Sequence, residues 1–285
     1  MIEWNYIGLV AETIDGLDKS CLDVVKRMRK DIKPFDIFNI NRLTNADLLL
    51  GNMESILKDF RGCRILATNG HGRFHQFTYG LCKMADYVSK EYCYVHIDHH
   101  WDSARSLTSS NCNAISCGSF VPYIMENTNA KSVAFLGVDV RSWSKFDYYD
   151  DKVREITNMC ASIAERNDGK FAYWDLENLV NSIQQDDVYV TIDLDVIAPK
   201  EIITGYDRGK LSRDGLFEAL KLIMSNKRII GADITGYSSD TGDLERTLGM
   251  NLSELGFFEC RKEKKACIER SMQLYLDLAS FLTIR

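Results

Sequence analysis

The chain has 285 residues, of which 45% are hydrophobic, 27% charged and 11% aromatic. A chain of this length forms one or two domains and buries about three-quarters of its unfolded surface, so its core needs no disulfides. The composition excludes disordered and collagen-like chains, and the net charge of −6 argues against nucleic acid as the main partner. All five histidines fall between His71 and His100, which makes that segment the first candidate for chemistry.

Neither the amino terminus nor the cysteines indicate an exported or membrane-bound protein. The first residues, MIEWNYIGLVAETID, lack a basic leader and predict a first strand rather than a signal peptide. No apolar run reaches the roughly 18 residues of a membrane span, so we expect no membrane partner. The nine cysteines form no C-x-x-C pair and several lie within apolar runs, which predicts reduced thiols and a cytoplasmic location.

Short apolar runs alternate with longer amphipathic segments along the chain. The short runs predict strands at Tyr6–Val10, Cys63–Thr68, Cys93–Asp98, Ser132–Val138, Val188–Asp193 and Ile229–Ile234. The amphipathic segments predict helices, the fourth of them with Ser212 as its N-cap, at Leu17–Lys30, Gln76–Lys90, Asp151–Arg166, Arg213–Ser225 and Lys264–Leu282. This alternation predicts a three-layer α/β/α sandwich with a mostly parallel central sheet. Because no Pro-, Gly- or Ser-rich linker divides the chain, we expect a single domain over residues 1–285.

The segment YVHIDHHWDS, residues 94–103, contains three closely spaced residues of metal-binding types. Asp98, His100 and Asp102 are two residues apart, so in an extended segment their side chains project from one face. His99 and Trp101 would then point to the opposite face. The spacing therefore predicts three ligands that leave one strand end together.

A second acidic motif, VTIDLDVIAP at residues 190–199, follows a predicted buried strand. Asp193 and Asp195 share one face there, and two buried carboxylates are costly unless cations neutralise them. Both motifs lie at the carboxyl ends of predicted strands, where open α/β sheets place their sites. Carboxylates combined with imidazole favour Mn²⁺, with Fe, Co, Ni and Zn as further candidates, and the number of ligands suffices for two ions.

The order of these motifs resembles the ureohydrolase superfamily, which includes arginase, agmatinase and formiminoglutamase. D-x-H-x-D is followed downstream by T-x-D-x-D-x-x-x-P, and the segment GRFHQFTYGL at residues 72–81 aligns with the family's upstream G-G-D-H-S motif. The resemblance implies an arginase-like fold, two divalent ions with Mn²⁺ as the expected metal, and six metal ligands: His75, Asp98, His100, Asp102, Asp193 and Asp195. One ion would take His75, Asp98, Asp102 and Asp193, and the other Asp98, His100, Asp193 and Asp195.

The resemblance also implies an activity. A hydroxide that bridges the two ions would attack a C–N bond of a guanidino, formimino or related amide-type substrate, either a small molecule or a peptide-borne group. Asp102 would then belong to the catalytic centre as well as to the metal site. The family suggests trimers or hexamers, so we expect a homo-oligomer.

Several positions depart from the family pattern around the substrate. Cys117 stands where many members carry a proton-shuttling histidine. A cysteine exchanges protons only if its pKa is lowered, so both a catalytic and a spectator role stay open for Cys117. Gly236 occupies the position of the guanidinium-binding glutamate, and Ala104 that of an asparagine that binds the substrate α-carboxylate in arginases. Free arginine is therefore a poor candidate substrate.

Two charged residues are candidates for replacing these lost contacts. Asp240 is the nearest acid after Gly236, whereas Asp233 is expected to be buried and structural. Arg105 follows the last ligand motif on a long polar loop, where it could pair with an anionic group of the substrate or stay solvated. We therefore expect Arg105 and Asp240 to contact the substrate.

The remaining histidines of the cluster are expected to play supporting roles. His96 shares strand parity with Asp98 but lies one step deeper, which favours a position in the core or beside the ligands. His99 faces away from the expected metals and is interpreted as structural.

Three other interpretations stay open. Asp98-His99-His100 spells the name motif of the DHH phosphoesterases, but residues 1–97 contain no Asp-rich motif of the kind that this family needs. A zinc deacetylase of the related arginase-like fold would keep a single metal ion and a His–His acid–base pair. A metal-binding pseudoenzyme would act by association, in keeping with the altered Glu and His positions.

Overall fold

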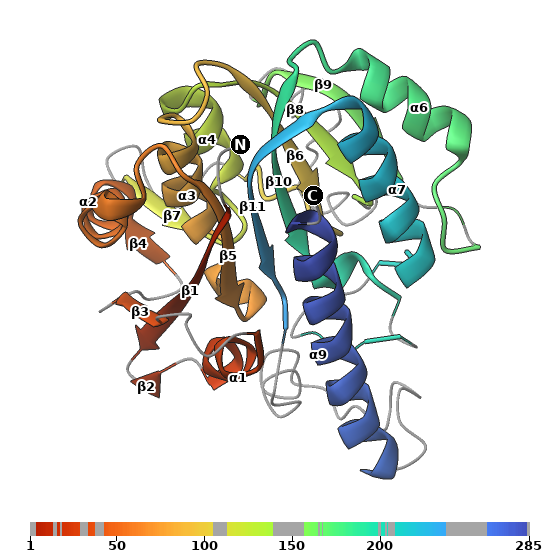
Figure 1. The fold of residues 1–285 in the computed structure, drawn as a ribbon, viewed down its shortest axis with the longest axis horizontal. Helices are drawn as coiled ribbons and strands as arrows, with labels where there is room; N and C mark the ends of the chain where they lie inside the picture. The colour runs from red at the N-terminus through yellow and green to blue at the C-terminus, as the bar shows by residue number, and fades with distance from the viewer. Residues whose placement is uncertain are drawn as a thin grey trace.

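The computed structural model describes residues 4–13, 16–17, 19–28, 34–37, 43–104, 113–138, 157–164, 166, 168–198, 201–202, 204, 209–237 and 261–283. Its centre is a sheet to which nine of the described strands belong (Figure 1). These strands are β1 (Trp4–Thr13), β2 (Gly16–Leu17), β3 (Pro34–Ile37), β5 (Arg64–Gly70), β6 (Tyr92–Ile97), β8 (Ala130–Leu136), β9 (Met159–Ile163), β10 (Asp187–Asp193) and β11 (Arg228–Thr235).

The sheet is mostly parallel, as the sequence predicts. Its strand order is β2-β1-β5-β11-β10-β6-β8-β9, and β3 also pairs with β1. Every pairing between described strands of this sheet is parallel except that of β1 with β2. The two near-continuous apolar strands, β10 and β11, lie at its centre, where helices cover both faces.

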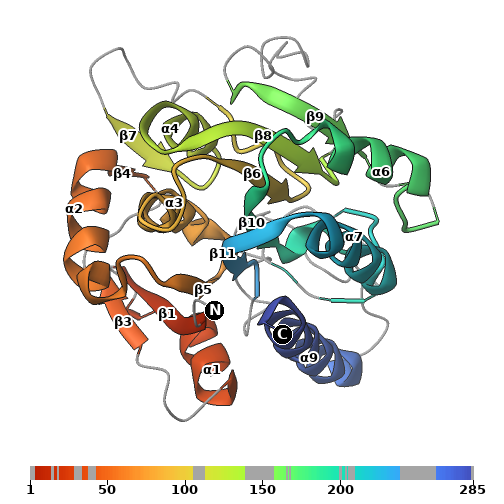
Figure 2. The same ribbon diagram turned by 45° about the horizontal axis from the view of Figure 1, so that its top comes forward.

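Helices form a layer on each face of the sheet (Figure 2). On one face lie α2 (Ala46–Leu57), α3 (Phe77–Ala85) and α4 (Val121–Asn127). On the other face lie α1 (Lys19–Met28), α6 (Tyr173–Ser182), α7 (Arg213–Asn226) and α9 (Arg261–Thr283). The expected three-layer α/β/α sandwich is confirmed. Within the described ranges, no helix is long and apolar enough to cross a membrane.

The alternation of side chains along β10 separates the two layers of the core. Val190 and Ile192 pack in the layer formed with α6, α7 and α9. Tyr189, Thr191 and Asp193 project to the opposite face, toward α3 and its preceding turn. One face of this strand thus runs from a buried aromatic ring to an expected metal ligand.

One predicted helix is wrong in the part that the structure describes. Residues 151–156 lie outside the described residues, but Met159–Ile163 forms strand β9 rather than part of a helix over Asp151–Arg166. β9 pairs in parallel with β8 at the edge of the sheet, and four of its five residues are partly exposed. An edge strand lacks the continuous apolar pattern of a central strand, so pairing with its neighbour determines its structure.

The other expected elements are present with small shifts at their ends. The six predicted strands correspond to β1, β5, β6, β8, β10 and β11, and four predicted helices to α1, α3, α7 and α9. The sequence interpretation missed α2, α4, α6, the strands β2 and β3, and the antiparallel pair of β4 (Leu43–Asn45) and β7 (Ala114–Ser116). The missed strands and α4 are short elements, in which periodicity is a weak signal.

The expected N-cap of α7 is confirmed, because the Ser212 hydroxyl accepts the backbone N–H of Gly215 at 3.1 Å. Changing Ser212 to alanine removes this acceptor and is expected to lower the free energy of unfolding by about 1 kcal/mol. Urea denaturation of S212A and of the wild-type chain measures the difference. S225A is the control, because the Ser225 hydroxyl bonds to the Lys221 carbonyl within the same helix and caps nothing. Equal stabilities for S212A and the wild-type chain would contradict the prediction.

Candidate metal centre

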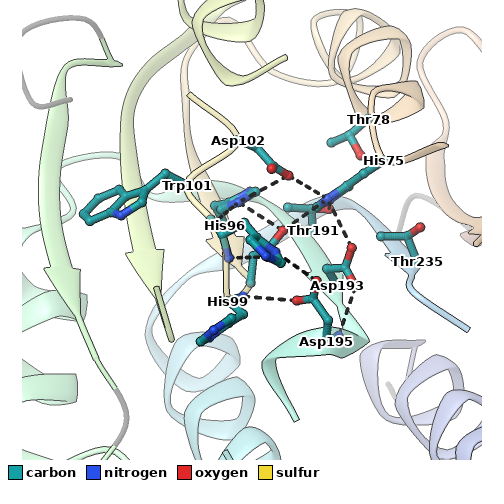
Figure 3. Close-up of polar contacts among 12 residues, drawn as sticks. His75, Thr78, His96, His99, Trp101, Asp102, Thr191, Asp193, Asp195 and Thr235 are labelled. Atoms are coloured by element: carbon teal, nitrogen blue, oxygen red, sulfur yellow. Dashed lines mark hydrogen bonds and ion pairs between the residues drawn. The ribbon is translucent and has the colours of Figure 1, made fainter. Parts of the chain in front are cut away.

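Three segments that are far apart in the sequence meet at one edge of the sheet (Figure 3). His75 lies between a short 3-10 helix, η2 (Gly72–Phe74), and the start of α3. Asp98 directly follows β6, and Asp193 is the last residue of β10. Because β6 and β10 are parallel neighbours, their carboxyl ends meet at the same edge.

The chain after β6 turns instead of continuing as a strand. β6 ends at Ile97, and Asp102 has a φ of 47°, in the left-handed region that aspartate tolerates better than most residues. The expectation of an extended segment from Asp98 to Asp102 is therefore wrong, although its side chains still converge. A straight strand rises about 3.3 Å per residue and would hold these two carboxylates too far apart to meet at one atom.

His75 and three carboxylates form the first candidate group. His75 Nδ1 lies 3.0 Å from Asp102 Oδ2, 3.2 Å from Asp98 Oδ2 and 3.5 Å from Asp193 Oδ2. Despite these distances, His75 Nδ1 and Asp98 Oδ2 make no hydrogen bond within the described part of the chain. Buried polar atoms that surround a common point without bonding to one another fit a site for a cation.

His100 and two carboxylates form the second candidate group. His100 Nδ1 lies 3.0 Å from Asp195 Oδ2 and 3.4 Å from Asp98 Oδ1. One ligand atom from each of these residues lies within 4.8 Å of the others. Asp98 thus turns one oxygen toward each group. The Asp193 carboxylate lies beside both, since its Oδ2 faces His75 and its Oδ1 accepts the backbone N–H of Asp195 at 3.0 Å.

The four carboxylates share a space that is nearly closed to water. Their side chains are at most 9% exposed, whereas the His100 side chain is 29% exposed. Burial raises the pKa of Asp195 to about 7, and the charge of Asp98 adds to this effect. Burial and the charges of Asp195 and Asp98 also raise the pKa of Asp193 well above its usual range. Two divalent cations would balance the four carboxylate charges, so this donor set fits them.

His96 lies closer to the expected ligands than strand parity alone indicates. Its Nε2 is 3.3 Å from Asp98 Oδ2, and its ring stacks on that of His75 with centroids 5.5 Å apart. Burial opposes ionisation of Asp98, yet the neighbouring His100, His75 and His96 rings hold the pKa of this carboxyl well below its usual range. Donor atoms of His75, His96 and Asp98 are close enough to hold one ion. His96 Nε2 also lies 3.1 Å from the His100 carbonyl oxygen, which only accepts hydrogen bonds, so this nitrogen carries hydrogen and His96 lies beside the ligands rather than among them.

Aromatic residues pack around this cluster. The ring of Phe120 lies 4.6 Å from that of His75, and Trp101 packs against Phe135 at 4.9 Å. In Figure 3 the Trp101 and His99 rings point away from the cluster, as the sequence predicts. The sequence interpretation missed Phe120, because only the packing of α4 beside α3 brings this residue to the site.

The sequence model of the arginase family matches residues 35–250, which is most of the chain. The chain belongs to the arginase family. No curated protein matches it in a sequence comparison.

Solved structures of the family have the same fold. Arginase from Bacillus subtilis subsp. subtilis str. 168 has a TM-score of 0.61 and 14% identity, with 100% of this chain and 99% of that chain covered. Formimidoylglutamase from the same strain has a TM-score of 0.58 and 12% identity, with 99% and 87% covered. Proclavaminate amidino hydrolase from Streptomyces clavuligerus has a TM-score of 0.55 and 16% identity, with 97% and 92% covered.

Cys117, the expected counterpart of a family histidine, lies in the turn after β7 and is partly exposed. Backbone hydrogen bonds connect this turn to the ligand segment. Ala104 N–H donates to the Gly118 carbonyl, and Val121 N–H donates to the Asp102 carbonyl, each at 3.1 Å. The Cys117 turn therefore lies beside the Asp102 segment, and the role of its thiol stays a prediction. Arg105 and Asp240, the expected substrate contacts, lie outside the described residues.

Gly236 stands at the position where the sequence comparison expects the family's guanidinium-binding glutamate. Gly236 has a φ of 90°, and a Cβ at this position would collide with Asp193 Oδ1 and the backbone nitrogen of Leu194. The position that aligns with the family's glutamate thus has no room for a side chain while Asp193 keeps its place. Here a carboxylate for a guanidinium group would have to come from another position.

This close approach generates a prediction for Gly236→Ala. The added methyl group displaces the Asp193 carboxylate and is expected to weaken Mn²⁺ binding by about 10- to 100-fold. Calorimetric titration of the metal-free protein with MnCl₂ measures the change. Gly51→Ala is the control, because Gly51 lies in α2 and a Cβ there meets no atom within 4 Å. Wild-type metal affinity in G236A would disprove the proposed crowding.

Metal binding is also expected to strengthen as the pH rises. Without an ion, burial gives the Asp195 carboxyl a pKa of about 7, so below that pH a proton occupies an expected metal ligand. Binding must release this proton, which costs about tenfold in apparent affinity for each pH unit below the pKa. MnCl₂ titrations between about pH 5.5 and 8.5 test the direction. An affinity that is constant or falls with pH over this range would contradict the prediction.

Proposed function

We propose that this chain is a binuclear metal-dependent hydrolase that cleaves a C–N bond of a guanidino, formimino or related amide-type substrate. The observation that carries the proposal is the pair of nitrogen and oxygen donor groups that share Asp98. Members of the arginase family are hydrolases that act on C–N bonds, and the membership of this chain in the family supports the proposal. The solved structures with its fold include an arginase, a formimidoylglutamase and an amidino hydrolase.

The six proposed ligands divide between two ions. One ion would be held by His75, Asp98, Asp102 and Asp193, and the other by Asp98, His100, Asp193 and Asp195. Mn²⁺ is the proposed metal, and Fe, Co, Ni and Zn also suit carboxylate and imidazole donors. Two such ions supply Lewis acidity for the substrate and activate water at neutral pH.

The protein contributes a rigid and asymmetric setting for this chemistry. The His75 side chain is 1% exposed and covered by Phe120, which excludes water from the first group. The His100 side chain is 29% exposed, so the second group is the more accessible side for a substrate. We propose that the substrate approaches from the His100 side.

The substrate is proposed to differ from free arginine. Gly236 has no room for a guanidinium-binding side chain, and Cys117 stands at the position of a family histidine. A small or peptide-borne guanidino, formimino or amide group fits this altered shell better. We propose that Arg105 and Asp240 contact the substrate and that Cys117 moves protons beside Asp102.

The remaining features of the proposal concern the whole chain. We propose a single domain that works in the cytoplasm as a homo-oligomer, without nucleic-acid or membrane partners. The net charge of −6 supports the exclusion of nucleic acid. Six cysteines in the described ranges are free thiols, which supports a reducing compartment.

The ligand assignment predicts the behaviour of Asp98→Ala and Asp193→Ala. Each change removes a carboxylate that both ions use, so each variant is expected to lose its bound metal and at least about 100-fold in activity. Elemental analysis of the purified proteins measures metal content. Asp187→Asn is a matched control at the opposite end of β10, where Asp187 pairs with Arg228, and it should keep the wild-type metal content.

The outcomes separate the alternatives. A wild-type metal content in both Asp98→Ala and Asp193→Ala would contradict the proposed site. One ion per wild-type chain would favour a deacetylase-like enzyme. Activity is tested by release of urea or ammonia from a panel of guanidino compounds, formimino acids and arginine-containing peptides. Two bound ions without hydrolysis of any member of this panel would favour a pseudoenzyme.

A further inference from the structure

Asp233 is a fully buried carboxylate that several neighbouring elements surround with donors. It lies in β11, and its side chain has an exposed fraction of 0%. Oδ1 accepts hydrogen bonds from Asn69 Nδ2 at 3.0 Å, Thr78 Oγ1 at 2.9 Å and Thr191 Oγ1 at 2.9 Å. Oδ2 accepts one from the Tyr189 hydroxyl at 2.8 Å. Burying a carboxylate is costly, so a side chain that only fills space in this core would be expected to be apolar.

One of these donors connects Asp233 to the candidate metal centre. Thr191 is the register partner of Asp233 in the β10–β11 pair and lies two residues before Asp193. Its hydroxyl oxygen is also 2.8 Å from His75 Nε2 (Figure 3). A hydroxyl group has one proton to donate, and Thr191 donates it to Asp233. The hydrogen of the second bond therefore comes from His75 Nε2.

This direction decides which nitrogen of His75 faces an ion. With hydrogen on Nε2, the ring turns its Nδ1 atom toward the oxygens of Asp98, Asp102 and Asp193, which lie 3.0–3.5 Å away. Metal-ligating histidines usually donate their other ring N–H to a carboxylate or carbonyl, which orients the ring and strengthens it as a donor. Here a threonine hydroxyl stands between the imidazole and the carboxylate.

We propose that Asp233, acting through Thr191, is a positioning residue that orients His75 and strengthens its hold on the first ion. This inference rests on the proposed function, because it assigns Asp233 a part in the proposed metal centre. His100 provides an internal comparison, since its ring contacts Asp98 and Asp195 in the second group. Breaking the His75–Thr191–Asp233 chain therefore weakens one of the two metal sites and spares the other.

The test is a titration of the metal-free protein with MnCl₂, followed by calorimetry and by electron paramagnetic resonance of Mn²⁺. Thr191→Val breaks the link between His75 and Asp233, and Asp233→Asn removes the negative charge at the end of the chain; each change is expected to weaken one site by about 10- to 100-fold. His75→Ala is expected to lose the first ion, so the site that is missing in its titration identifies the site that T191V and D233N should weaken. Because both residues act in one chain, the double variant T191V/D233N should lose no more than the larger single loss. Thr191→Ser keeps the hydroxyl and should restore the affinity.

Tyr189→Phe is the matched structural control. It removes the donor to the other Asp233 oxygen but leaves the Thr191 link, so it should lower thermal stability while both sites keep their affinity. If T191V binds both ions like the wild-type chain, or if Y189F loses the same site as D233N, the inference is wrong and the proposed function stands. If the wild-type chain binds no Mn²⁺, the proposed function fails and this inference fails with it.

Discussion

The mutual repulsion of four buried carboxylates is the constraint on which the rest of this structure depends. Asp98, Asp102, Asp193 and Asp195 come from two strand ends and share a space that is nearly closed to water. Burial and neighbouring charge raise the pKa of Asp195 and of Asp193, so the folded chain bears an electrostatic cost at this edge. Divalent cations would offset that cost, and the packing of the sheet below keeps the carboxylates from moving apart.

The register of the parallel strands organises the polar groups beneath the site into rows. β6 and β10 pair Tyr94 with Tyr189 and His96 with Thr191, so aromatic rings lie deep and hydrogen-bonding groups lie nearer the ligands. β11 adds Asp233 beside Thr191, and the turn before α3 adds His75 from above. A shift of one residue in any of these registers would move the same side chains to the other face of the sheet.

One close approach beside the candidate metal centre restricts the residue at position 236. Gly236 directly follows β11, beside the end of β10, and the carboxylate of Asp193 takes the space that a side chain at position 236 would need. The absence of a side chain there and the position of the carboxylate are therefore linked. A side chain at position 236 would displace a candidate metal ligand.

The sequence by itself determined the sheet, most of its strands and the residue types of the centre. The apolar runs of β10 and β11 carry enough local information to predict strands, and the run of β10 also predicts Asp193 at the end of its strand. The edge strand β9 was predicted as part of a helix, because its partly exposed residues obtain their conformation from pairing with β8. The turn at Asp102 was likewise missed, since the need to bring two carboxylates to one histidine arises only in three dimensions.

Tertiary structure alone decided the partners of Asp233, His96 and Gly236. From the sequence, Asp233 is a buried acid, His96 a residue of the core or its border, and Gly236 a departure from a family motif. Their contacts with Thr191, His75 and Asp193 join segments that are distant in the chain. Spacing along one strand specifies a face of the sheet, but the atoms that meet on that face depend on which strands become neighbours and in which register.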